Sequence, residues 1–352
     1  MSFECGVFHT RYRSDMGLRP RPAQRIRLAV FAAFLLVFPF FASPYWLDLA
    51  NQVAIATVGA IGLNILVGYT GQISLGQGAF MAVGAYAAGL FTLNLGLPWE
   101  VSIVLACFLT AAVGVFFGLP SLRLKGLYLA IATLAAQEIV QWAMVNWTAV
   151  TGGTEAIVLP APRLFGLRLN SAFNFYWIAV LAAAATALFT ANLFRSRAGR
   201  AFVAVRDQDI AASVIGVDVF RTKLLAFATS SFFAGLAGAL IAFYRSIITW
   251  ERFTLEISIV YLAMIIVGGL GTIRGSLFGA ALITLLPAFI TSAGRAVQET
   301  APQVAGLLPY AQQAVFGLVI ILFLIFEPKG LSKLWGNVKD YFHVWPFAYR
   351  RG

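Results

Sequence analysis

Charged residues are scarce in this sequence. Only 11% of the residues are Asp, Glu, Lys or Arg, against roughly 25% in an average globular protein, whereas 60% are hydrophobic. A soluble chain of 352 residues has no place for so much apolar surface, because a single core stops growing near about 250–300 residues. The same composition excludes a disordered chain. We therefore expect an all-α, polytopic integral membrane protein.

Residue types that build catalytic and metal sites are also rare. The chain has two cysteines, Cys5 and Cys107, and two histidines, His9 and His343, which lie in opposite tails. These positions exclude a disulfide scaffold and give no metal-ligand spacing. The sequence contains no Gly-Lys pair and hence no Walker A loop. We expect no cofactor and no catalytic residue, so any ATP must be bound by another subunit.

Long apolar runs dominate the rest of the chain. About ten of them are long enough to cross roughly 30 Å of hydrocarbon, with one or two allowed to be broken or re-entrant. They lie at residues 28–47, 49–67, 79–97, 101–122, 126–147, 172–194, 224–244, 257–273, 275–293 and 307–326. Together they define a transmembrane domain at 28–330, between a basic tail at 1–27 and an amphipathic tail at 331–352.

The Lys and Arg residues are sorted by membrane side. With the N-terminus inside and ten spans, 20 of the 25 fall in inner segments, as the positive-inside rule requires. Both termini are therefore expected in the cytoplasm. The net charge of +11 then reflects topology, and we expect no nucleic-acid partner. The last tail has apolar residues at helical spacing, which predicts either a helix lying on membrane lipid at the inner surface or a partly ordered tail.

An uncharged, glycine-rich segment at 68–78 separates two of the apolar runs. Irregular backbone at membrane depth is tolerated only where it is buried in protein or lines a wet cavity. The segment is therefore either part of a substrate path or a tight packing turn. In the first interpretation, the residues that line the translocation path are Asn64, Gln72, Ser74 and Gln77.

Glu138 lies deep inside the apolar run 126–147. A carboxylate at the bilayer centre costs several kcal/mol, so we expect it to face the interior of the bundle. Gln137 and Gln141 flank it, and only Gln141 shares its helical face. Glu138 either lines the translocation path as a gate or makes a structural hydrogen bond to another helix.

Glycines four residues apart predict close helix packing. Gly271, Gly275 and Gly279 form a doubled small-xxx-small register, and Gly235 lies on a similar face of another run. The stretch around Gly271 also repeats an earlier one. Residues 67–73 read VGYTGQI and residues 267–273 read VGGLGTI. This match indicates either an internal duplication or a chance similarity between two short segments.

The inner loop 195–223 predicts a short helix that docks onto a partner. Asp207 can cap this helix, Asp209 suits its first turn and Gly216 can end it. Its small apolar face is ringed by basic residues, which favours docking over the alternative of a solvated connector. The residues that we assign to this role are Arg200, Arg206, Asp207, Asp209, Ile210, Ala211, Ala212 and Gly216.

Six stretches match, in the same order, the pattern of one transporter family. They are GLNILVGYTGQISLGQGAF at 62–80, LRLKGLYLAIATL at 122–134, TGG at 151–153, GRA at 199–201 with RD at 206–207, VGGLG at 267–271 and FEPKG at 326–330. Through these motifs, the chain resembles the M-type permease subunit of branched-chain-amino-acid (LIV-type) ABC importers. The resemblance covers about residues 55–330 and leaves both tails outside it.

This resemblance implies a transmembrane heterodimer with a second permease in the bacterial inner membrane. It also implies two cytoplasmic ATPase subunits and an extracytoplasmic solute-binding protein. The coupling segment of such importers reads EAA-x-x-x-G, and here DIAASVIG at 209–216 takes its place. The Glu is thus replaced by an Asp in a shifted register. The outer loop carries Thr-Glu-Ala at 154–156 where the family more often has Ser-Asp-Gly.

The function expected from the resemblance is import of a small polar solute. Branched-chain or other amino acids are the first expectation, and urea, short amides or aromatic acids are alternatives that share this architecture. A secondary transporter is a different class, which would need ion-coupling carboxylates within the membrane, and Glu138 is the only one. A membrane-embedded enzyme would need a catalytic cluster at the membrane surface, and the sequence shows none.

Overall fold

The computed structural model describes residues 22–121, 126–164, 167–168, 171–298, 308–327 and 330–344. The long helices are α2 (Pro22–Phe41), α3 (Pro44–Asn64), α4 (Gln77–Asn94), α5 (Trp99–Ser121), α6 (Leu127–Asn146), α8 (Ala172–Leu193), α11 (Val219–Arg245), α12 (Leu255–Gly268), α13 (Ile273–Gln298) and α14 (Leu308–Phe326). The other helices are the π-helix η1 (Ile65–Tyr69), α7 (Thr148–Thr151), α9 (Arg197–Asp207), α10 (Asp209–Val214), the 3-10 helix η2 (Trp250–Phe253) and α15 (Leu331–Val344). The strands are β1 (Ile157–Val158), β2 (Arg163–Leu164), β3 (Leu167–Arg168) and β4 (Ile247–Ile248).

The apolar runs of the sequence form helices. Within the part of the chain that the structure describes, six are long and apolar enough to cross a membrane, namely Pro44–Tyr69, Trp99–Pro120, Leu127–Asn146, Ala172–Leu193, Val219–Arg245 and Ile273–Ser292. Shorter apolar helices cover Ala29–Phe41, Leu255–Gly268 and Gln313–Phe323. The expectation of an all-α, polytopic membrane protein is confirmed. The count of ten spans stays a prediction, although each predicted run overlaps a different one of the long helices.

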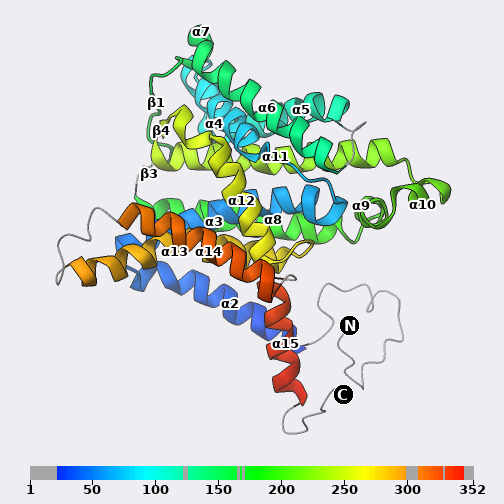
Figure 1. Cartoon of the computed structure of the whole chain (residues 1–352). Helices are drawn as coiled ribbons and strands as arrows, with labels where there is room; N and C mark the ends of the chain where they lie inside the picture. The colour runs from blue at the N-terminus through cyan, green and yellow to red at the C-terminus, as the bar shows by residue number, and fades with distance from the viewer. Residues whose placement is uncertain are drawn as a thin grey trace.

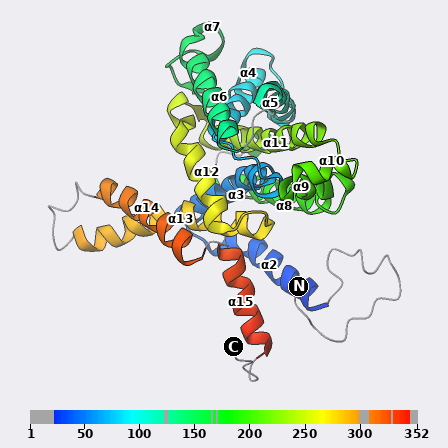
Figure 2. The same ribbon diagram turned by 45° about the vertical axis from the view of Figure 1, so that its right-hand side comes forward.

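Helix α3 forms the centre of the bundle (Figure 1). Its most apolar stretch is 83% buried, and it packs against α8, α11, α12 and α13. Helix α11 in turn packs against α3, α4 and α5. Helices that are apolar on all sides can be covered in this way by other helices or by lipid. In Figure 2, α13 and α14 extend to one side of this core, away from α4, α5 and α6.

Glycine brings α4, α5 and α11 together. A Cβ atom added to Gly84 would collide with the backbone of Gly235, and one added to Gly235 would lie 2.6 Å from Oγ1 of Thr110. The three helices therefore touch at Gly235 through their backbones and one hydroxyl. Such close approach is the usual role of small residues between membrane helices.

Two of the three glycines near the start of α13 pack against α12. A Cβ atom on Gly275 would lie 2.8 Å from the carbonyl oxygen of Gly268, and one on Gly279 would collide with the carbonyl of Met264. Gly271, the third glycine, is not part of the helix-packing register that the sequence predicts. It lies in the turn between α12 and α13 with a φ of 70°, a conformation that side chains other than glycine's rarely adopt.

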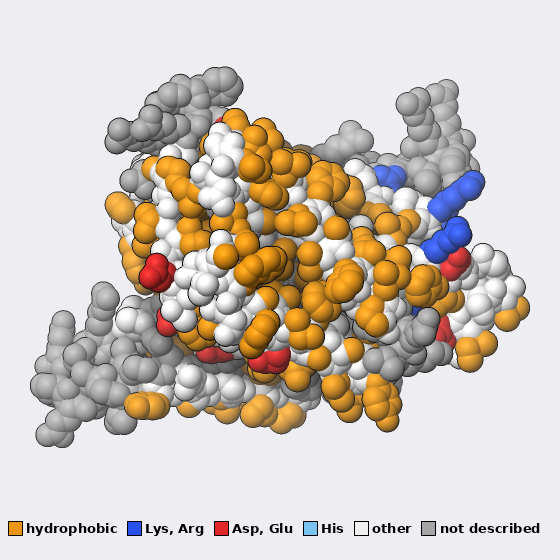
Figure 3. Space-filling model, turned by 90° about the horizontal axis from the view of Figure 1, so that it is seen from above, with side chains coloured by type: hydrophobic (Ala, Val, Ile, Leu, Met, Phe, Trp, Pro, Cys, Tyr) orange, Lys and Arg blue, Asp and Glu red, His pale blue; other side chains and the backbone are white. Residues whose placement is uncertain are grey.

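The two ends of the bundle carry different elements. One end has α7 and the two-stranded pair in which Ile157 of β1 lies opposite Ile248 of β4, and the other end has α9, α10 and α15 (Figure 1). Strands β2 and β3 form a second short antiparallel pair. Figure 3 shows Lys and Arg side chains gathered at the end that carries α9 and α10, while apolar side chains cover the middle of the face. This apolar middle is the surface that a bilayer would cover.

Candidate translocation and coupling sites

The connection between α3 and α4 is broken inside the bundle. Helix α3 continues as the π-helix η1, and residues 71–76 are non-helical before α4 begins at Gln77. The side chain of Gln77 donates a hydrogen bond to the carbonyl of Gly59 at 3.1 Å. Each helical residue adds about 1.5 Å along the axis, so Gly59 lies about 15 Å back from Tyr69, the last residue of η1. The chain therefore doubles back along α3, and α4 starts at depth, as the uncharged composition predicts.

Side chains from two other helices cap the start of α4. The backbone N–H of Gly78 donates to Oγ of Ser258 at 2.8 Å, and the N–H of Ala79 donates to Oε1 of Gln137 at 2.6 Å. The amide nitrogen of Gln137 donates to the carbonyl of Phe253 at 2.8 Å. Helix N-termini leave N–H groups without partners, and here α6 and α12 supply them. Sequence reasoning missed this role, for which the only signal is an uncharged polar residue within an apolar run.

Asn64 ties the end of α3 to the turn between α12 and α13. Its Nδ2 donates to the carbonyl of Thr272 at 3.0 Å and to Oγ of Ser276 at 2.8 Å, and its Oδ1 accepts from the N–H of Gly271 at 2.9 Å. Asn64 is 1% exposed. Two of these bonds go to backbone groups and one to a side chain, and all of them hold α3 against the start of α13.

The other predicted path residues are buried as well. Ser74 accepts a hydrogen bond from the N–H of Gly76 at 3.3 Å, and Gln77 bonds to α3 as described. Burial alternates along the extended segment, so that Gln72 and Ser74 point inward while Ile73 is 41% exposed. Asn64, Ser74 and Gln77 thus brace the broken segment through hydrogen bonds of their side chains. Gln72 makes no such bond to any described residue.

Gln72 is buried without a partner for its side chain. It is 3% exposed, and neither its oxygen nor its amide nitrogen makes a hydrogen bond to the described residues. Its backbone N–H donates to the carbonyl of Leu66 at 3.1 Å. A buried polar group without a partner costs about 1–3 kcal/mol. Gln72 is therefore the predicted path residue whose side chain remains able to bind a polar ligand or water.

Glu138 lies on the exposed face of α6, so the expectation that it faces the interior of this bundle is wrong. Gln137, one residue earlier, is fully buried and occupies the interior position. The difference follows from geometry, since one residue turns the side chain by about 100° around a helix. Ala135 and Trp142 are exposed on the same face as Glu138. The polar group that this helix gives to the core is an amide and not a carboxylate.

The inner loop forms two short helices instead of one. Helix α9 begins after Ser196, whose Oγ accepts from the N–H of Gly199 at 3.4 Å. Asp207 is the last residue of α9, and Gln208 stands at the cap of α10 without a side-chain hydrogen bond. The predicted capping role of Asp207 is therefore wrong. Because α9 extends to residue 207, the cap position falls one residue later.

Gly216 ends α10 as its position in the sequence predicts. It has a φ of 87°, and its N–H donates to the carbonyl of Ser213 at 3.1 Å. The N–H of Val217 donates to the carbonyl of Ala212 at 3.0 Å. These two bonds form a Schellman motif, which requires a left-handed residue at this place.

Helix α10 presents an apolar face to solvent. Ile210 is 65% exposed, Val214 is 81% exposed and Ile215 is 74% exposed. Ala211 is exposed beside them, whereas Ala212 is 2% exposed and faces its own chain. Ala212 is thus a packing residue and not part of the exposed docking surface that the sequence suggests.

Two contacts hold this loop together, and a third brings it against the bundle. Nζ of Lys223, at the start of α11, lies 3.7 Å from Oδ2 of Asp209 in the first turn of α10. Arg200 donates from Nη1 to the carbonyl of Arg195 at 3.0 Å. Arg206, the next basic residue of α9, lies against Gly71 and Gly271. The loop is therefore a folded protrusion with one free apolar face.

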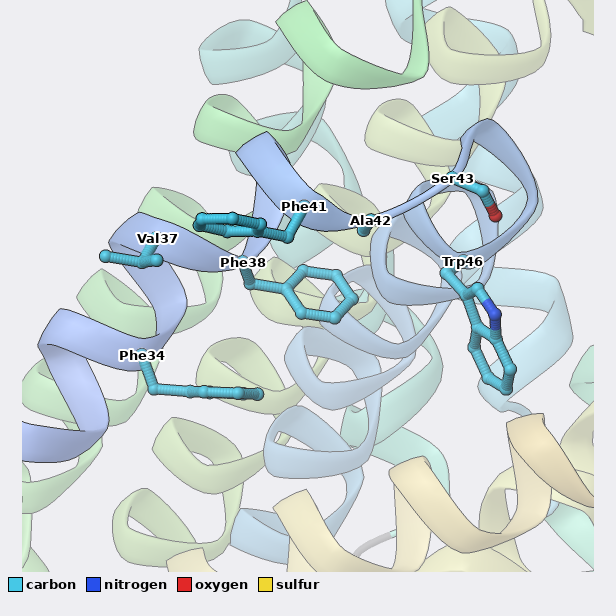
Figure 4. Close-up of a pocket in the computed structure, with 7 residues that line it drawn as sticks. All are labelled: Phe34, Val37, Phe38, Phe41, Ala42, Ser43 and Trp46. Carbon is cyan, nitrogen blue, oxygen red and sulfur yellow. The ribbon is translucent and has the colours of Figure 1, made fainter.

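An apolar cavity of about 380 Å³ lies between α2 and the start of α3. Figure 4 shows its lining, which consists of Phe34, Val37, Phe38, Phe41, Ala42, Ser43 and Trp46. All of these side chains except Ser43 are apolar or aromatic. Such a lining suits hydrocarbon and offers no charged group to a zwitterionic solute.

Comparisons with known proteins agree on one family. Residues 45–324 match the family model described as branched-chain amino acid transport system, permease component. The permease protein LivM of the high-affinity branched-chain amino acid transport systems of Salmonella typhimurium and Escherichia coli is 32% identical over 332 residues in each case. The alignments cover 88% of this chain and 75% of each relative. A LivM protein of Methanocaldococcus jannaschii, described as a probable branched-chain amino acid transport permease, is 24% identical over 77% of this chain and 88% of the relative.

No solved structure matches the chain. A permease component provides the membrane part of a transport system and is not an enzyme, and in ABC importers ATP is hydrolysed by separate subunits. The family model covers most of the chain, including the broken connection between α3 and α4 and the inner loop. The chain therefore belongs to the family of branched-chain amino acid transport system permease components.

Proposed function

We propose that this chain is the membrane-spanning permease subunit of an ABC importer that carries branched-chain amino acids across the bacterial inner membrane. The observation that carries the proposal is the match to LivM proteins over 88% of the chain. In this proposal, ten helices cross the membrane and both termini face the cytoplasm. The end with α9 and α10, where the Lys and Arg side chains gather, is then the cytoplasmic end.

The proposed assembly has a second, homologous permease, two cytoplasmic ATPase subunits and an extracytoplasmic solute-binding protein. The exposed apolar face of α10 supports the ATPase contact, because a protein seldom leaves three large apolar side chains of one short helix in water. The opposite end, with α7, β1 and β4, is the surface left for the binding protein. Substrate choice would then depend largely on the protein that delivers the solute.

The exposed position of Glu138 supports a protein or water neighbour on that face of α6. A carboxylate that faces lipid at the bilayer centre costs about 3 kcal/mol. Glu138 lies near the middle of α6 and is exposed on the isolated chain. We therefore place the second permease or the translocation path against this face, with Gln72 as a further path residue. Asn64, Ser74 and Gln77 support the path by bracing the broken segment.

Uptake into proteoliposomes tests the function. The complete complex, with its binding protein and ATPase subunits, should accumulate labelled leucine only when ATP is supplied on the ATPase side. Unlabelled isoleucine and valine should compete, whereas urea, acetamide and benzoate should not. Competition by urea or benzoate alone would reassign the substrate, and uptake without ATPase subunits would point to a secondary transporter.

Photolabelling from the lipid phase tests the surroundings of Glu138. In the assembled complex, a lipid-soluble carbene reagent should not label Glu138, because a partner chain or water covers it. Phe108, which is 62% exposed on α5 and apolar, is the control and should be labelled. Equal labelling at both positions would show that Glu138 faces lipid and would remove it from the path.

One substitution tests the ATPase contact. Val214→Asp places a charge on the exposed face of α10, and it should abolish capture of the ATPase subunits while membrane insertion remains normal. Val158→Asp is the matched control, because Val158 is 67% exposed at the opposite end. Wild-type capture with Val214→Asp would show that the inner loop is a connector.

A further inference from the structure

The repeated stretches at 67–73 and 267–273 lie against each other. A Cβ atom on Gly68 would collide with the backbone nitrogen of Gly271, and one on Gly271 would lie 3.0 Å from the carbonyl oxygen of Gly68. Each stretch also turns at its last glycine, with a φ of 69° at Gly71 and 70° at Gly271. We call these two turns the glycine elbows. The first leads into α4 and the second into α13.

Arg206 of α9 bridges both elbows. A Cβ atom on Gly71 would lie 3.4 Å from Cγ and 3.7 Å from Cα of Arg206, and one on Gly271 would lie 2.8 Å from its Nη1. The stem of the arginine therefore passes over the first elbow and its guanidinium reaches the second. A Cβ atom would crowd the guanidinium at Gly271, whereas at Gly71 it would only touch the stem. The two elbows and the arginine form one packed unit.

The charge of Arg206 suits this position. Helix η1 and α12 both end at the elbows, and helix C-termini carry partial negative charge on carbonyl groups without partners. No Asp or Glu of the described residues pairs with Arg206, which instead interacts electrostatically with Tyr69. The hydroxyl of Tyr69 lies near the backbone of Ile273 and near Arg206. The last residue of η1, the first residue of α13 and the arginine thus lie close together.

Helix α9 is attached firmly enough to move this unit. The ring of Phe194 stacks on Tyr69 with centroids 3.5 Å apart, and Phe202 of α9 packs edge-on against Phe194. Phe202 is fully buried. Only Gln208 separates α9 from α10. Movement of α10 therefore reaches Arg206, in the last turn of α9, across Gln208 alone.

We propose that Arg206 is the positioning residue that transmits movement of α10 to both glycine elbows, and so to the starts of α4 and α13. This inference rests on the proposed ABC importer function and adds the route by which the ATPase acts on the membrane helices. Arg206 is exposed on the isolated chain, and in this proposal it is a transmission residue in contact with the elbows and not part of the surface that holds the ATPase. The sequence pattern instead assigns Arg206 to that docking surface. The docking role and the transmission role predict different results when Arg206 is replaced.

Substitutions at Arg206 separate the two roles. Arg206→Ala in the complete complex should keep normal capture of the ATPase subunits but reduce leucine uptake by about tenfold, within the range of known coupling effects. Arg206→Lys keeps the charge and should restore part of the uptake, while Arg206→Met keeps only the stem and should restore less. Arg221→Ala is the control, because Arg221 is an exposed arginine of the same loop that pairs with Asp218.

A labelling experiment reports the movement itself. In a chain with Cys5→Ser and Cys107→Ser, a cysteine replaces Ile73, which is exposed next to the first elbow. Its rate of reaction with a thiol reagent should change when ATP is added to the wild-type complex and should stay constant in Arg206→Ala. A merely structural arginine would alter the basal rate and leave the response to ATP intact.

The outcomes distinguish this inference from the proposed function. If wild-type chain captures no ATPase subunit and takes up no leucine with ATP, the function is wrong. If Arg206→Ala loses ATPase capture as Val214→Asp does, Arg206 is a docking residue and the transmission role is wrong. Wild-type uptake by Arg206→Ala with normal capture would also overturn it.

Discussion

The two glycine elbows have similar sequences but lead into their helices in different ways. After Gly271, α13 begins at once at Ile273. After Gly71, the chain stays extended until α4 begins at Gln77. The same short pattern thus gives a tight turn in one place and a re-entrant segment in the other. The residues that come after each glycine, and their partners, decide the outcome.

The caps of the two helices explain the difference. Helix α13 is capped locally, because Oγ1 of Thr272 accepts from the N–H of Gly275 at 3.1 Å. Helix α4 is capped from a distance, by Gln137 of α6 and Ser258 of α12. A local cap forms with the turn itself, whereas a distant cap requires the folded bundle. The cap of α4 therefore depends on tertiary structure, whereas the cap of α13 is encoded nearby.

Breaking the distant cap should have the largest effect. Gln137→Leu removes the acceptor of Ala79, the acceptor of Ser258 and the donor to Phe253, and leaves buried polar groups without partners. Each such group costs about 1–3 kcal/mol, so the free energy of unfolding should fall by about 3 kcal/mol or more. The melting temperature of the purified chain in detergent measures this loss.

Gln141→Leu is the matched control for this prediction. Gln141 lies one turn further along α6 and is only partly buried, so its replacement should change the melting temperature little. If both variants melt together near the wild-type temperature, the start of α4 does not depend on the distant cap, and the contrast between the elbows fails.

Alanine should destabilise the second elbow more than the first. Gly71→Ala and Gly271→Ala both place a side chain at positive φ, which costs about 1–2 kcal/mol. At Gly271, the new Cβ also meets the carbonyl of Gly68 at 3.0 Å, whereas at Gly71 its nearest neighbour is Cγ of Arg206 at 3.4 Å. A backbone carbonyl cannot swing aside as a side chain can.

Denaturant unfolding in detergent compares the two variants. Gly271→Ala should unfold at a lower denaturant concentration than Gly71→Ala. The order should persist when Arg206→Ala is added to both, because the contact with Gly68 remains. Equal midpoints would show that the two elbows are packed alike, and that only their caps differ.

The sequence predicts the locally encoded features well. The apolar runs predict the long helices because helix formation in a membrane follows from apolar composition alone. Gly216 is predicted to end α10 because its Schellman motif needs only neighbouring residues. The uncharged segment at 68–78 predicts irregular backbone at depth. Each of these inferences uses information within a few residues of the feature.

The features that depend on contacts between distant helices could not be predicted. Gln137 and Glu138 are adjacent and both polar, and only the rotation of α6 against α4 decides that the amide enters the core. The contact of Arg206 with both elbows brings together three segments that lie far apart in the sequence. Whether the side chain of Gln72 has a hydrogen-bond partner likewise depends on all the helices around it. Hydropathy and spacing carry no information on such contacts.

Removing the local cap should have a moderate effect. Thr272→Val keeps the shape of the side chain but removes the acceptor for the N–H of Gly275. Loss of an N-terminal cap costs about 1 kcal/mol, so the melting temperature should fall less than with Gln137→Leu. Thr272→Ser restores the hydroxyl and should restore most of the stability. A larger loss with Thr272→Val than with Gln137→Leu would reverse the assignment of local and distant caps.

The smallest effect on stability is expected at Gln72, which is the counterpart of Thr272 in the first elbow. Thr272 uses its side chain to hold a helix, whereas the side chain of Gln72 is buried with no partner among the described residues. Replacing a buried amide that makes no hydrogen bond by an apolar side chain of similar size removes a desolvation cost. Gln72→Leu should therefore leave the melting temperature unchanged or raise it. Leucine uptake by the assembled complex should fall nevertheless, because the amide can no longer meet a polar solute or water in the proposed path.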